Sequence, residues 1–516
     1  MSDTNTTTIL LPSKNEGAVD ITDSINTSGK NIPSPKAYMT CSESDENTEG
    51  LDSSTLHNTH HQDDLRQSDR LQVTDHHEYP EQRTPGTDIN ELVSQCLSGN
   101  LSTKQLETLA ESYEQTIAAR REVVRRQVSV AKGKEKNGDA FFDALPLEGY
   151  HYAKAIGACC ENIIGYMTVP VGIAGPLLVD NIEEHVPFAT TEGALIAGVC
   201  RRCKAINLAG GAVTELIADY ISRSPCLKCP SLATAYAAKS WLESSEGFSR
   251  MQKSFREAGR YINLKDIQVS IVGELLYPRF VASTGDAMGM NMISIAVEKA
   301  IAAFQSSGFS DIVTISLSGN MCSDKKPAAV NWIRGRGKYV VAQARLPSTV
   351  VHNTLKTTPA TLVELNVAKN LTGSALAGSI GGFNAHASNI VSGIFLATGQ
   401  DMAQVVESSN CLTTMSENGS DLLISVTMPS VEVATVGGGT GLPAQASMLK
   451  LLQLHGTHKL GPGYNAGRLA RVIAATVLAG ELNICSALAT KDLTRAHLRL
   501  NRKGGSTGPN RNTKPI

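Results

Sequence analysis

The alternation of apolar and polar positions separates a helical stretch near residue 100 from a longer region of mixed periodicity. Ser102-Thr-Lys-Gln105 is a helix-capping pattern, and apolar residues then recur at helical spacing, which predicts a helix from about Leu106 to Arg126. Between about residues 213 and 317, runs with the two-residue period of strands enclose two stretches with helical period. Their order is βαββαβ, which is typical of a ferredoxin-like domain.

Six elements are expected in this mixed region, with a further helix on either side of it. They are strand 213–218, helix 231–258, strands 267–272 and 275–282, helix 289–305 and strand 312–317. Before them, Phe188-Ala-Thr-Thr-Glu-Gly193 predicts a helix start, with Thr191 as the cap and Glu192 in the first turn, where the helix dipole favours a carboxylate. After them, a long apolar helix is expected over about 466–489.

The first 85 residues differ from the rest of the chain in composition. They are rich in Ser, Thr, Asn, Asp and Gly and keep no period, which predicts a disordered polar extension. Residues 504–516 are expected to form a second flexible tail. The whole chain has 516 residues, 41% of them hydrophobic, so the part between has enough material for a large core or for two or three domains.

Charge and cysteine content exclude several classes of protein. A formal net charge of −2 is too balanced for a protein whose main partner is a nucleic acid. We find neither an apolar run of about 20 residues nor a secretory leader, which predicts a soluble cytoplasmic protein without a membrane span.

Eleven scattered cysteines predict free thiols. The pairs Cys200/Cys203 and Cys226/Cys229 have a spacing that zinc accepts, yet the first pair falls in a predicted helix, and we expect no metal.

The candidate chemistry is concentrated in one polar loop, Ser316-Leu-Ser-Gly-Asn-Met-Cys-Ser-Asp-Lys-Lys-Pro327. An apolar strand precedes the loop and a helix start follows it, so rigid elements fix both ends. A Lys held beside an Asp at such a place would stabilise the oxyanion of a polarised carbonyl. The loop offers Asp324, Lys325 and Lys326 for this purpose. The alternative is an ordinary solvated turn, and the loop alone does not decide between the two.

Other candidates lie outside this loop. Charges are costly to bury in the Ala/Gly/Ser-rich region that follows, so Lys369 and Asp401 are either functional or paired in a structural salt bridge. Gly285-Asp-Ala-Met-Gly-Met-Asn-Met292 leads from a strand into a helix, whose first N–H groups suit a phosphate, and Arg260 is a candidate for a further phosphate. For His497, a surface position and a catalytic role both stay open.

Six motifs occur in the order of one known family. They are ENIIGYM (161–167), ATTEG (189–193), GDAMGMN (285–291), SGNMCSDKKPAAVNW (318–332), GQDMAQ (399–404) and TVGGGTGLP (435–443). On these motifs the chain resembles 3-hydroxy-3-methylglutaryl-coenzyme A (HMG-CoA) reductase of the eukaryotic, class I type, over about residues 90–503. The resemblance covers the catalytic portion. The multi-span anchor of eukaryotic members has no counterpart here, so an association with the endoplasmic reticulum is not expected.

The resemblance implies an α+β fold in several parts. A large substrate domain surrounds a long central helix, a ferredoxin-like βαββαβ domain that binds NADP is inserted in it, and a small helical domain precedes both. The implied division is 1–85 polar extension, 88–160 helical domain, 161–223 and 328–503 substrate domain, 224–317 inserted NADP-binding domain, 318–327 catalytic connecting loop and 504–516 tail.

The family's reaction implies roles for four residues. It reduces (S)-HMG-CoA to (R)-mevalonate and CoA by two hydride transfers from NADPH, in the mevalonate pathway of isoprenoid and sterol biosynthesis. By resemblance, Lys325 is the cation at the carbonyl oxygen, Glu192 the nearby proton donor and Asp401 the carboxylate coupled to both. His497 resembles the acid that protonates the departing CoA thiolate.

The resemblance also assigns binding residues. Positions that match substrate-binding residues are Arg201, Arg223, Ser318, Asp324, Lys326, Lys369, His386 and Asn389, with Arg201 and His386 on the CoA side. Positions that match the NADP site are Arg260, Asp286, Met290, Asn291, Asn320 and Asn501. Gly259 stands where the family often has Ser near the cofactor phosphate, so NADP preference is expected to rest mainly on Arg260.

Quaternary structure and regulation transfer from the family only in part. Family members place their active sites between subunits, which implies a homodimer or homotetramer with shared sites. Animal relatives carry a phosphorylatable Ser where this chain has Lys503, so that regulatory switch is not expected. Two other functions stay open. One is the same fold using NAD in the oxidative direction, and the other is a catalytically weak, reductase-like binding or inhibitor-resistance protein.

Overall fold

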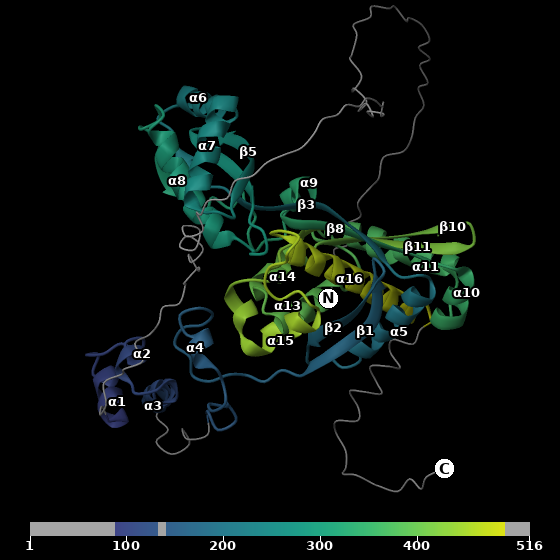
Figure 1. The fold of residues 1–516 in the computed structure, drawn as a ribbon, viewed down its shortest axis with the longest axis horizontal. Coiled ribbons are helices and arrows are strands. Elements are labelled where there is room, and N and C mark those ends of the chain that lie inside the picture. The colour runs from purple at the N-terminus through teal and green to yellow at the C-terminus, as the bar shows by residue number, and fades with distance from the viewer. Residues whose placement is uncertain (1–87, 133–140, 491–516) are drawn as a thin grey trace, which may run out of the picture. The chain divides into compact units, whose positions relative to one another are not determined.

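The computed structural model describes residues 88–132 and 141–490, so the predicted polar extension and C-terminal tail lie outside the described residues. The described chain begins with helices α1 Ile89–Leu97, α2 Leu106–Leu109, α3 Tyr113–Lys132 and α4 Tyr152–Ala155 (Figure 1).

The capping box is confirmed, because the Ser102 N–H donates to Gln105 Oε1 at 2.9 Å and the Gln105 N–H donates to Ser102 Oγ at 3.4 Å. The single long helix predicted after it is wrong. Ala110 is extended, and Ser112 Oγ accepts the Gln115 N–H at 3.0 Å at the start of α3.

A mixed sheet forms one layer of the large lobe. Its strand order is β3-β8-β11-β10-β9, with a parallel pair between β9 and β10 and antiparallel pairs elsewhere. The strands are β3 Val213–Arg223, β8 Gly337–Leu346, β9 Gly382–Phe383, β10 Cys411–Asn418 and β11 Asp421–Val431. Alternate residues of β8, from Val340 to Leu346, are buried, so one face of the sheet packs on the core.

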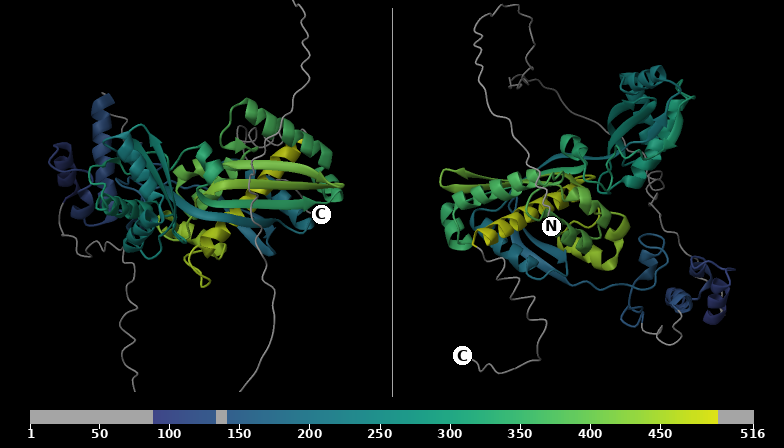
Figure 2. Two further views of the ribbon diagram at one scale, coloured as in Figure 1. Left: turned by 90° about the horizontal axis from the view of Figure 1, so that it is seen from above. Right: turned by 180° about the vertical axis from the view of Figure 1, so that it is seen from behind.

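A long helix, α16 Tyr464–Ala489, lies at the centre of this lobe and confirms the apolar helix predicted there. It packs against β8 and β11 and against helices α5 Leu195–Leu208 and α13 Ala387–Thr398, as Figures 1 and 2 show. The hairpin of β1 Val171–Val179 and β2 Ile182–Ala189 packs against α5 and α13. The remaining elements of the lobe are short. They are α9 Ala329–Arg334, α10 Ser348–Val350, η2 Val351–Leu355, α11 Pro359–Leu365, η3 Asn366–Gly373, α12 Ser374–Leu376, η4 Met402–Gln404, α14 Val405–Ser408, η5 Gly438–Gly441 and α15 Pro443–Leu451.

The region between β3 and β7 contains a second sheet with helices on one face. Its elements are β4 Cys226–Lys228, α6 Leu232–Leu242, α7 Ser245–Ala258, β5 Asn263–Val272, β6 Leu275–Ser283, α8 Met290–Gln305 and β7 Val313–Ser316. Strand β6 pairs with β5 on one side and with β3 and β4 on the other, and β4 also pairs with β7. If β3 and β4 are taken as one interrupted strand, the order is fourth-first-third-second. This confirms the α+β class with a ferredoxin-like βαββαβ unit.

The predicted helix over 231–258 is wrong in one respect, because it is two helices, α6 and α7. Ser244 Oγ accepts the Gly247 N–H at 3.1 Å and begins α7. A side chain at Gly247 would place its Cβ 1.9 Å from the Trp241 carbonyl oxygen, so the tight turn between the helices requires glycine.

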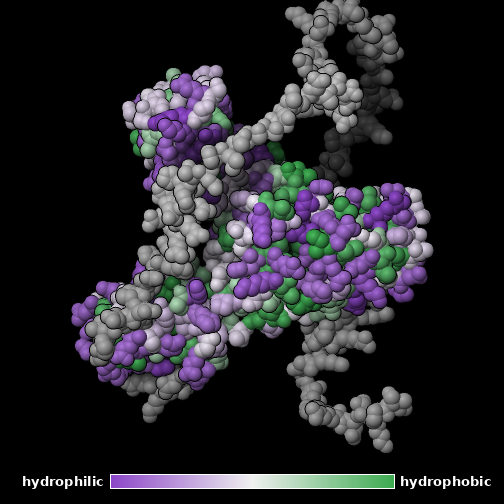
Figure 3. Space-filling model, viewed as in Figure 1, coloured by the Kyte–Doolittle hydropathy of each residue, from purple (hydrophilic) through white to green (hydrophobic). Residues whose placement is uncertain are grey.

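Two separate groups of buried side chains stabilise the two sheets. Phe188, Phe395 and many residues of α16 belong to the core of the large lobe, whereas Phe255 and Phe280 belong to the core of the inserted sheet. On the face that Figure 3 shows, exposed apolar side chains form small scattered areas among polar ones. Helix α16 is long and apolar enough to cross a membrane, contrary to the expectation that the chain has no such run. However, 78% of its most apolar window is buried, as in a core helix.

Helix α13 and strand β2 approach each other closely at Gly393. A Cβ at this position would lie 2.7 Å from Phe188 Cδ1, and the Phe188 ring is fully buried. Replacing Gly393 by alanine is therefore expected to lower the free energy of unfolding by about 1–3 kcal/mol, the usual cost of overpacking a core. Urea unfolding measures this change. Gly441→Ala is the control, since nothing lies within 4 Å of a Cβ there, and an equal loss in both variants would exclude the contact with Phe188 as the cause.

Candidate active site

The loop over residues 318–327 lies between β7 and α9 and has an unusual backbone. Three of its residues, Asn320, Ser323 and Lys325, have left-handed φ values of 62°, 57° and 56° although none is glycine. Such a conformation costs roughly 1–2 kcal/mol for a residue with a Cβ, so contacts must hold the loop in place. Asn331 supplies one of them, because its Nδ2 donates to the Lys326 carbonyl oxygen at 3.2 Å.

Lys325 and Asp401 form an ion pair at the surface of this loop. Lys325 Nζ lies 3.0 Å from Asp401 Oδ2, and the two side chains are 45% and 33% exposed, so a ligand can reach them. The hydrogen bond that Lys325 donates to Asp401 raises the pKa of Lys325 against the opposing effect of burial, which keeps the lysine a cation. Asp401 is itself oriented, because its Oδ1 accepts the Ala403 N–H at 3.0 Å at the start of η4.

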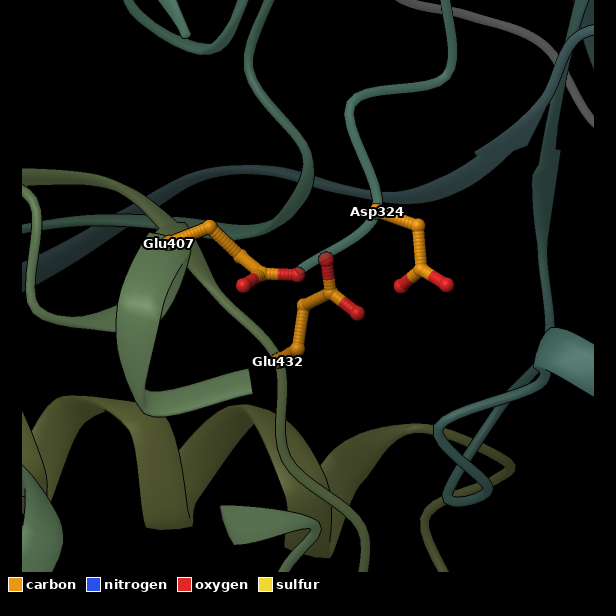
Figure 4. Close-up of side chains that lie close together, drawn as sticks. All are labelled: Asp324, Glu407 and Glu432. Carbon is orange, nitrogen blue, oxygen red and sulfur yellow. The ribbon is translucent and has the colours of Figure 1, made fainter. Parts of the chain in front are cut away.

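A cluster of buried charges lies directly behind the loop. The carboxyl groups of Asp324, Glu407 and Glu432 point toward one another, and oxygens from all three lie within 4.8 Å of each other (Figure 4). Arg336 is fully buried among them. It donates from Nη2 to Asp324 Oδ1 at 3.0 Å, pairs through Nε with Glu432 and lies 3.8 Å from Glu407 Oε1. Glu407 Oε1 also accepts the Lys325 backbone N–H at 2.8 Å.

Asp324 is the only member of this cluster that the sequence predicted as a site residue. The signal for the others was present, since Glu407 and Glu432 stand in apolar surroundings (Val405-Val-Glu-Ser and Val431-Glu-Val), as Asp401 does. Among the described residues, this is the one group of three or more potential metal ligands. Its cation is the Arg336 guanidinium, and the described Cys200/Cys203 and Cys226/Cys229 pairs form no such group.

Glu192, Arg201 and His386 line a different cavity, of about 240 Å³, between α5 and α16. The structure corrects the position of Glu192, which is exposed and lies before the helix. Helix α5 starts only at Leu195, because Ala194 has a left-handed φ of 71°. Thr190 Oγ1, and not Thr191, accepts the Glu192 N–H at 3.0 Å. No hydrogen bond or ion pair within the described residues joins Glu192 to Lys325 or Asp401.

His386 is held in one orientation by its neighbours. Its Nε2 lies 2.8 Å from the Gly480 carbonyl oxygen, and Asn389 Nδ2 lies 3.3 Å from its Nδ1. Because a carbonyl only accepts, Nε2 carries the proton and Nδ1 accepts from the amide. The backbone is fixed by the buried Glu481, which the sequence analysis missed and which accepts the His386 N–H at 2.8 Å.

The other predicted substrate residues lie partly in the 318–327 loop and partly outside it. Lys326 is exposed and donates to the Asp324 carbonyl oxygen at 3.0 Å, and Ser318 Oγ lies 3.6 Å from Cys322 Sγ. Arg223 ends β3, and its buried Nε has no hydrogen-bond partner among the described residues. Lys369 is half-buried in the π-helical segment η3.

The predicted NADP residues divide into buried and exposed groups. Met290 begins α8, and its sulfur accepts from Arg336 Nη2 at 3.0 Å. Asp286 is 3% exposed, and its Oδ1 accepts the Ala466 N–H at 3.0 Å in the first turn of α16, so it joins the two lobes. Asn291, Asn320 and Arg260 are exposed, and the Arg260 guanidinium lies 5.5 Å from the Tyr261 ring centroid. His497 and Asn501 lie outside the described residues.

The fold and the site define an α+β protein with an inserted ferredoxin-like unit and an exposed lysine–aspartate pair on the connecting loop. Residues 116–502 match the family described as hydroxymethylglutaryl-coenzyme A reductase. The chain belongs to this family, as the motifs predicted.

Relatives and solved structures agree with this assignment. The chain is 51% identical over 414 residues to 3-hydroxy-3-methylglutaryl-coenzyme A reductase of Phycomyces blakesleeanus, covering 80% of this chain and 34% of the relative. It is 50% identical over 418 residues to the reductase of Schizosaccharomyces pombe, covering 81% of this chain and 39% of that one. The chain thus spans little more than a third of these relatives. The class II reductase of Streptococcus pneumoniae bound to NADPH shares the fold, with a TM-score of 0.53 and 19% identity over 75% of this chain and 100% of that one.

Proposed function

We propose that this chain reduces (S)-HMG-CoA to (R)-mevalonate and CoA with NADPH, in the mevalonate pathway. The observation that carries the proposal is the Lys325–Asp401 pair, a cation held at 3.0 Å from its carboxylate on a strained loop that remains open to a ligand. The relative from Phycomyces blakesleeanus, which matches 80% of this chain, is named as this reductase.

Reduction of a thioester places negative charge on the carbonyl oxygen at each of two steps, and Lys325 is proposed to stabilise it. Asp401 keeps the ammonium oriented and charged. Glu192 and His497 are the proposed proton donors, to the substrate oxygen and to the CoA thiolate respectively. The CoA portion of the substrate is proposed to bind at Arg201 and His386, which share the cavity with Glu192.

Cationic side chains are available for the free carboxylate of the substrate. We propose that Arg223, Lys326 and Lys369 bind it, with Ser318, Asp324 and Asn389 contacting the rest of the hydroxymethylglutaryl group. The unpartnered Nε of Arg223 among the described residues supports this assignment, because a buried guanidinium N–H requires an acceptor.

NADPH would supply the hydride, and the inserted domain offers a fitting site for it. Gly285 and Gly289 have left-handed φ values of 65° and 96°, and the turn between them leads into the first N–H groups of α8, where a pyrophosphate is favoured. We propose that Asp286, Met290, Asn291, Asn320 and Asn501 form this site and that Arg260 contacts the 2′-phosphate.

We further propose that residues 224–317 are the NADP-binding domain and that a second copy of the chain completes the active site. Neither Lys325 nor Asp401 is among the residues that line the cavity of Glu192, which supports a shared site.

The test is NADPH consumption by the purified chain with HMG-CoA, with mevalonate measured as product. Arg260→Ala is expected to raise the KM for NADPH by about 10-fold or more and to leave turnover with NADH unchanged, because the lost guanidinium contact concerns only the phosphate. Arg250→Ala is the matched control, because Arg250 is an exposed arginine on helix α7, which ends at Ala258 shortly before Arg260.

Substrate binding without turnover by either cofactor would contradict the enzymatic function and favour the binding or inhibitor-resistance protein. Faster turnover with NADH than with NADPH would favour the NAD-dependent alternative. A soluble, cytoplasmic location remains a prediction, which fractionation of cells producing the chain would test.

A further inference from the structure

We propose that Arg336, Glu407 and Glu432 form a buried cluster of charged side chains that supports the loop and positions Lys325. We also propose that Glu407 and Glu432 share one proton. The inference rests on the proposed function, because it concerns the lysine that is proposed to act on the substrate carbonyl. The three residues are positioning residues, since they act through the backbone of the loop over 318–327.

Glu407 acts directly on the conformation of Lys325. Its Oε1 accepts the Lys325 N–H at 2.8 Å, and Lys325 has the left-handed φ of 56°. Because this conformation is unfavourable for lysine, a fixed acceptor at its N–H selects it over the alternatives. The side chain then leaves the loop toward Asp401, 3.0 Å from Nζ. Glu407 therefore determines the direction in which the ammonium points.

Arg336 fastens the part of the loop that precedes Lys325. Its Nη1 donates to the Cys322 carbonyl oxygen at 2.7 Å and to the Ser222 carbonyl oxygen of β3 at 2.9 Å. Its Nη2 donates to Asp324 Oδ1 at 3.0 Å. A planar guanidinium with several fixed acceptors has little freedom, so the loop is held against strand β3 on one side and against Glu407 on the other.

The cluster has more carboxyl groups than cations, and protonation of one carboxyl group reduces this excess of negative charge. One guanidinium serves three carboxyl groups within 4.8 Å, and the side chains of Arg336, Glu407 and Glu432 have no exposed surface. Glu407 Oε2 and Glu432 Oε2 are buried and have no hydrogen-bond partner among the described residues. A proton on one carboxyl group would provide a donor to the other and would remove one buried negative charge (Figure 4).

The electrostatics of the pair agree with this account. Burial and repulsion by Glu432 raise the pKa of Glu407 to about 8, and burial also raises the pKa of Glu432. The charged and titratable groups that face the Glu407–Glu432 pair are Asp324, Lys325 and Arg336, with the Cys322 thiol beyond Arg336. The pair therefore keeps one proton at neutral pH and loses it as the pH rises through about 8. The added buried charge is then expected to disturb the Lys325 backbone contact and to lower kcat.

The decisive comparison is between Glu407→Gln and Glu407→Ala. Glutamine keeps an acceptor for the Lys325 N–H and a donor for Glu432 but does not titrate, whereas alanine removes both contacts. We expect Glu407→Gln to lower kcat only slightly at pH 7 and to remove the alkaline loss of kcat that we expect of the wild type near pH 8. Glu407→Ala is expected to lower kcat by about 10²-fold, the usual effect of misplacing a catalytic group by 1 Å, with the KM for NADPH unchanged. Glu417→Gln, an exposed position on β10, is the control.

A second measurement does not depend on turnover. Infrared spectroscopy of the wild-type chain is expected to show a protonated buried carboxyl band at pH 7 that disappears above pH 9 and is missing in Glu407→Gln. An active wild type whose pH profile is unchanged in Glu407→Gln, or which lacks this band, would overturn the inference while the proposed function stands. An inactive wild type that shows the band would contradict the proposed function but not the shared proton. If Glu407→Ala does not fold, Glu407→Gln and the band decide the outcome.

Discussion

Replacing Lys325 by alanine is expected to lower kcat by about 10²–10³-fold, the effect of removing one oxyanion-stabilising group. The reason is that its ammonium lies at the accessible surface of the loop, 3.0 Å from Asp401, where a ligand can reach it. The KM for HMG-CoA is expected to change little, because the charge on the carbonyl oxygen develops in the transition state. NADPH consumption at saturating substrate measures the change in kcat.

Two companion variants make the result for Lys325 specific. Lys450→Ala removes an exposed lysine from α15 and is expected to leave kcat at the wild-type value. Lys325→Arg keeps the positive charge but presents a broader, planar head group, and it is expected to retain only part of the activity. Near-normal turnover by a folded Lys325→Ala protein would contradict the role proposed for this residue.

Replacing Arg336 by methionine is expected to cause the largest loss of stability, about 3–5 kcal/mol in the free energy of unfolding. This is the usual cost of leaving buried charges without their partner. The substitution keeps an apolar side chain in the cavity but leaves Glu432, Glu407 and Asp324 without the guanidinium. Denaturant unfolding at pH 7 measures the change.

Arg345→Met is the matched control for Arg336. Arg345 lies on β8 and pairs with Asp421 at 3.0 Å, but its side chain is 57% exposed. Solvent weakens such a pair, so its loss is expected to cost no more than about 1 kcal/mol. If the two variants lose the same free energy of unfolding, the buried cluster contributes less to stability than its burial and contacts indicate.

Much of the fold could be predicted from the sequence, because the periodicity is strong where one face of an element is buried. The order βαββαβ between 213 and 317 and the helix now seen as α16 follow directly from this pattern. The errors lie at breaks within helical patterns. At Ser112 and at Ser244 a side-chain cap competes with continuation of the helix, and the apolar spacing is the same on both sides of each break.

The site could be predicted only in part. The polar loop, Lys325 and Asp401 stood out because charges and turn residues interrupt an apolar pattern, and they prove to be paired. Arg336 follows a glycine in Gly335-Arg-Gly, where it looks like a turn residue, and only tertiary structure brings it to Glu432. Glu192 was misplaced because the left-handed Ala194 delays the start of α5, a conformation that alanine does not announce in a sequence.

Strand β3 belongs to both sheets, and this restricts how the inserted domain moves. Residues 213–220 of the strand pair with β8, and residues 221–223 pair with β6. A rotation of the inserted domain about this entry would break ladder hydrogen bonds, so the strand is a stiff attachment. The return connection is the loop over 318–327, which the side chains of Arg336 and Glu407 fasten at Cys322 and Lys325 outside either sheet. If the inserted domain moves relative to the large lobe, this loop would therefore change conformation before strand β3 does. Such a movement would also displace Lys325.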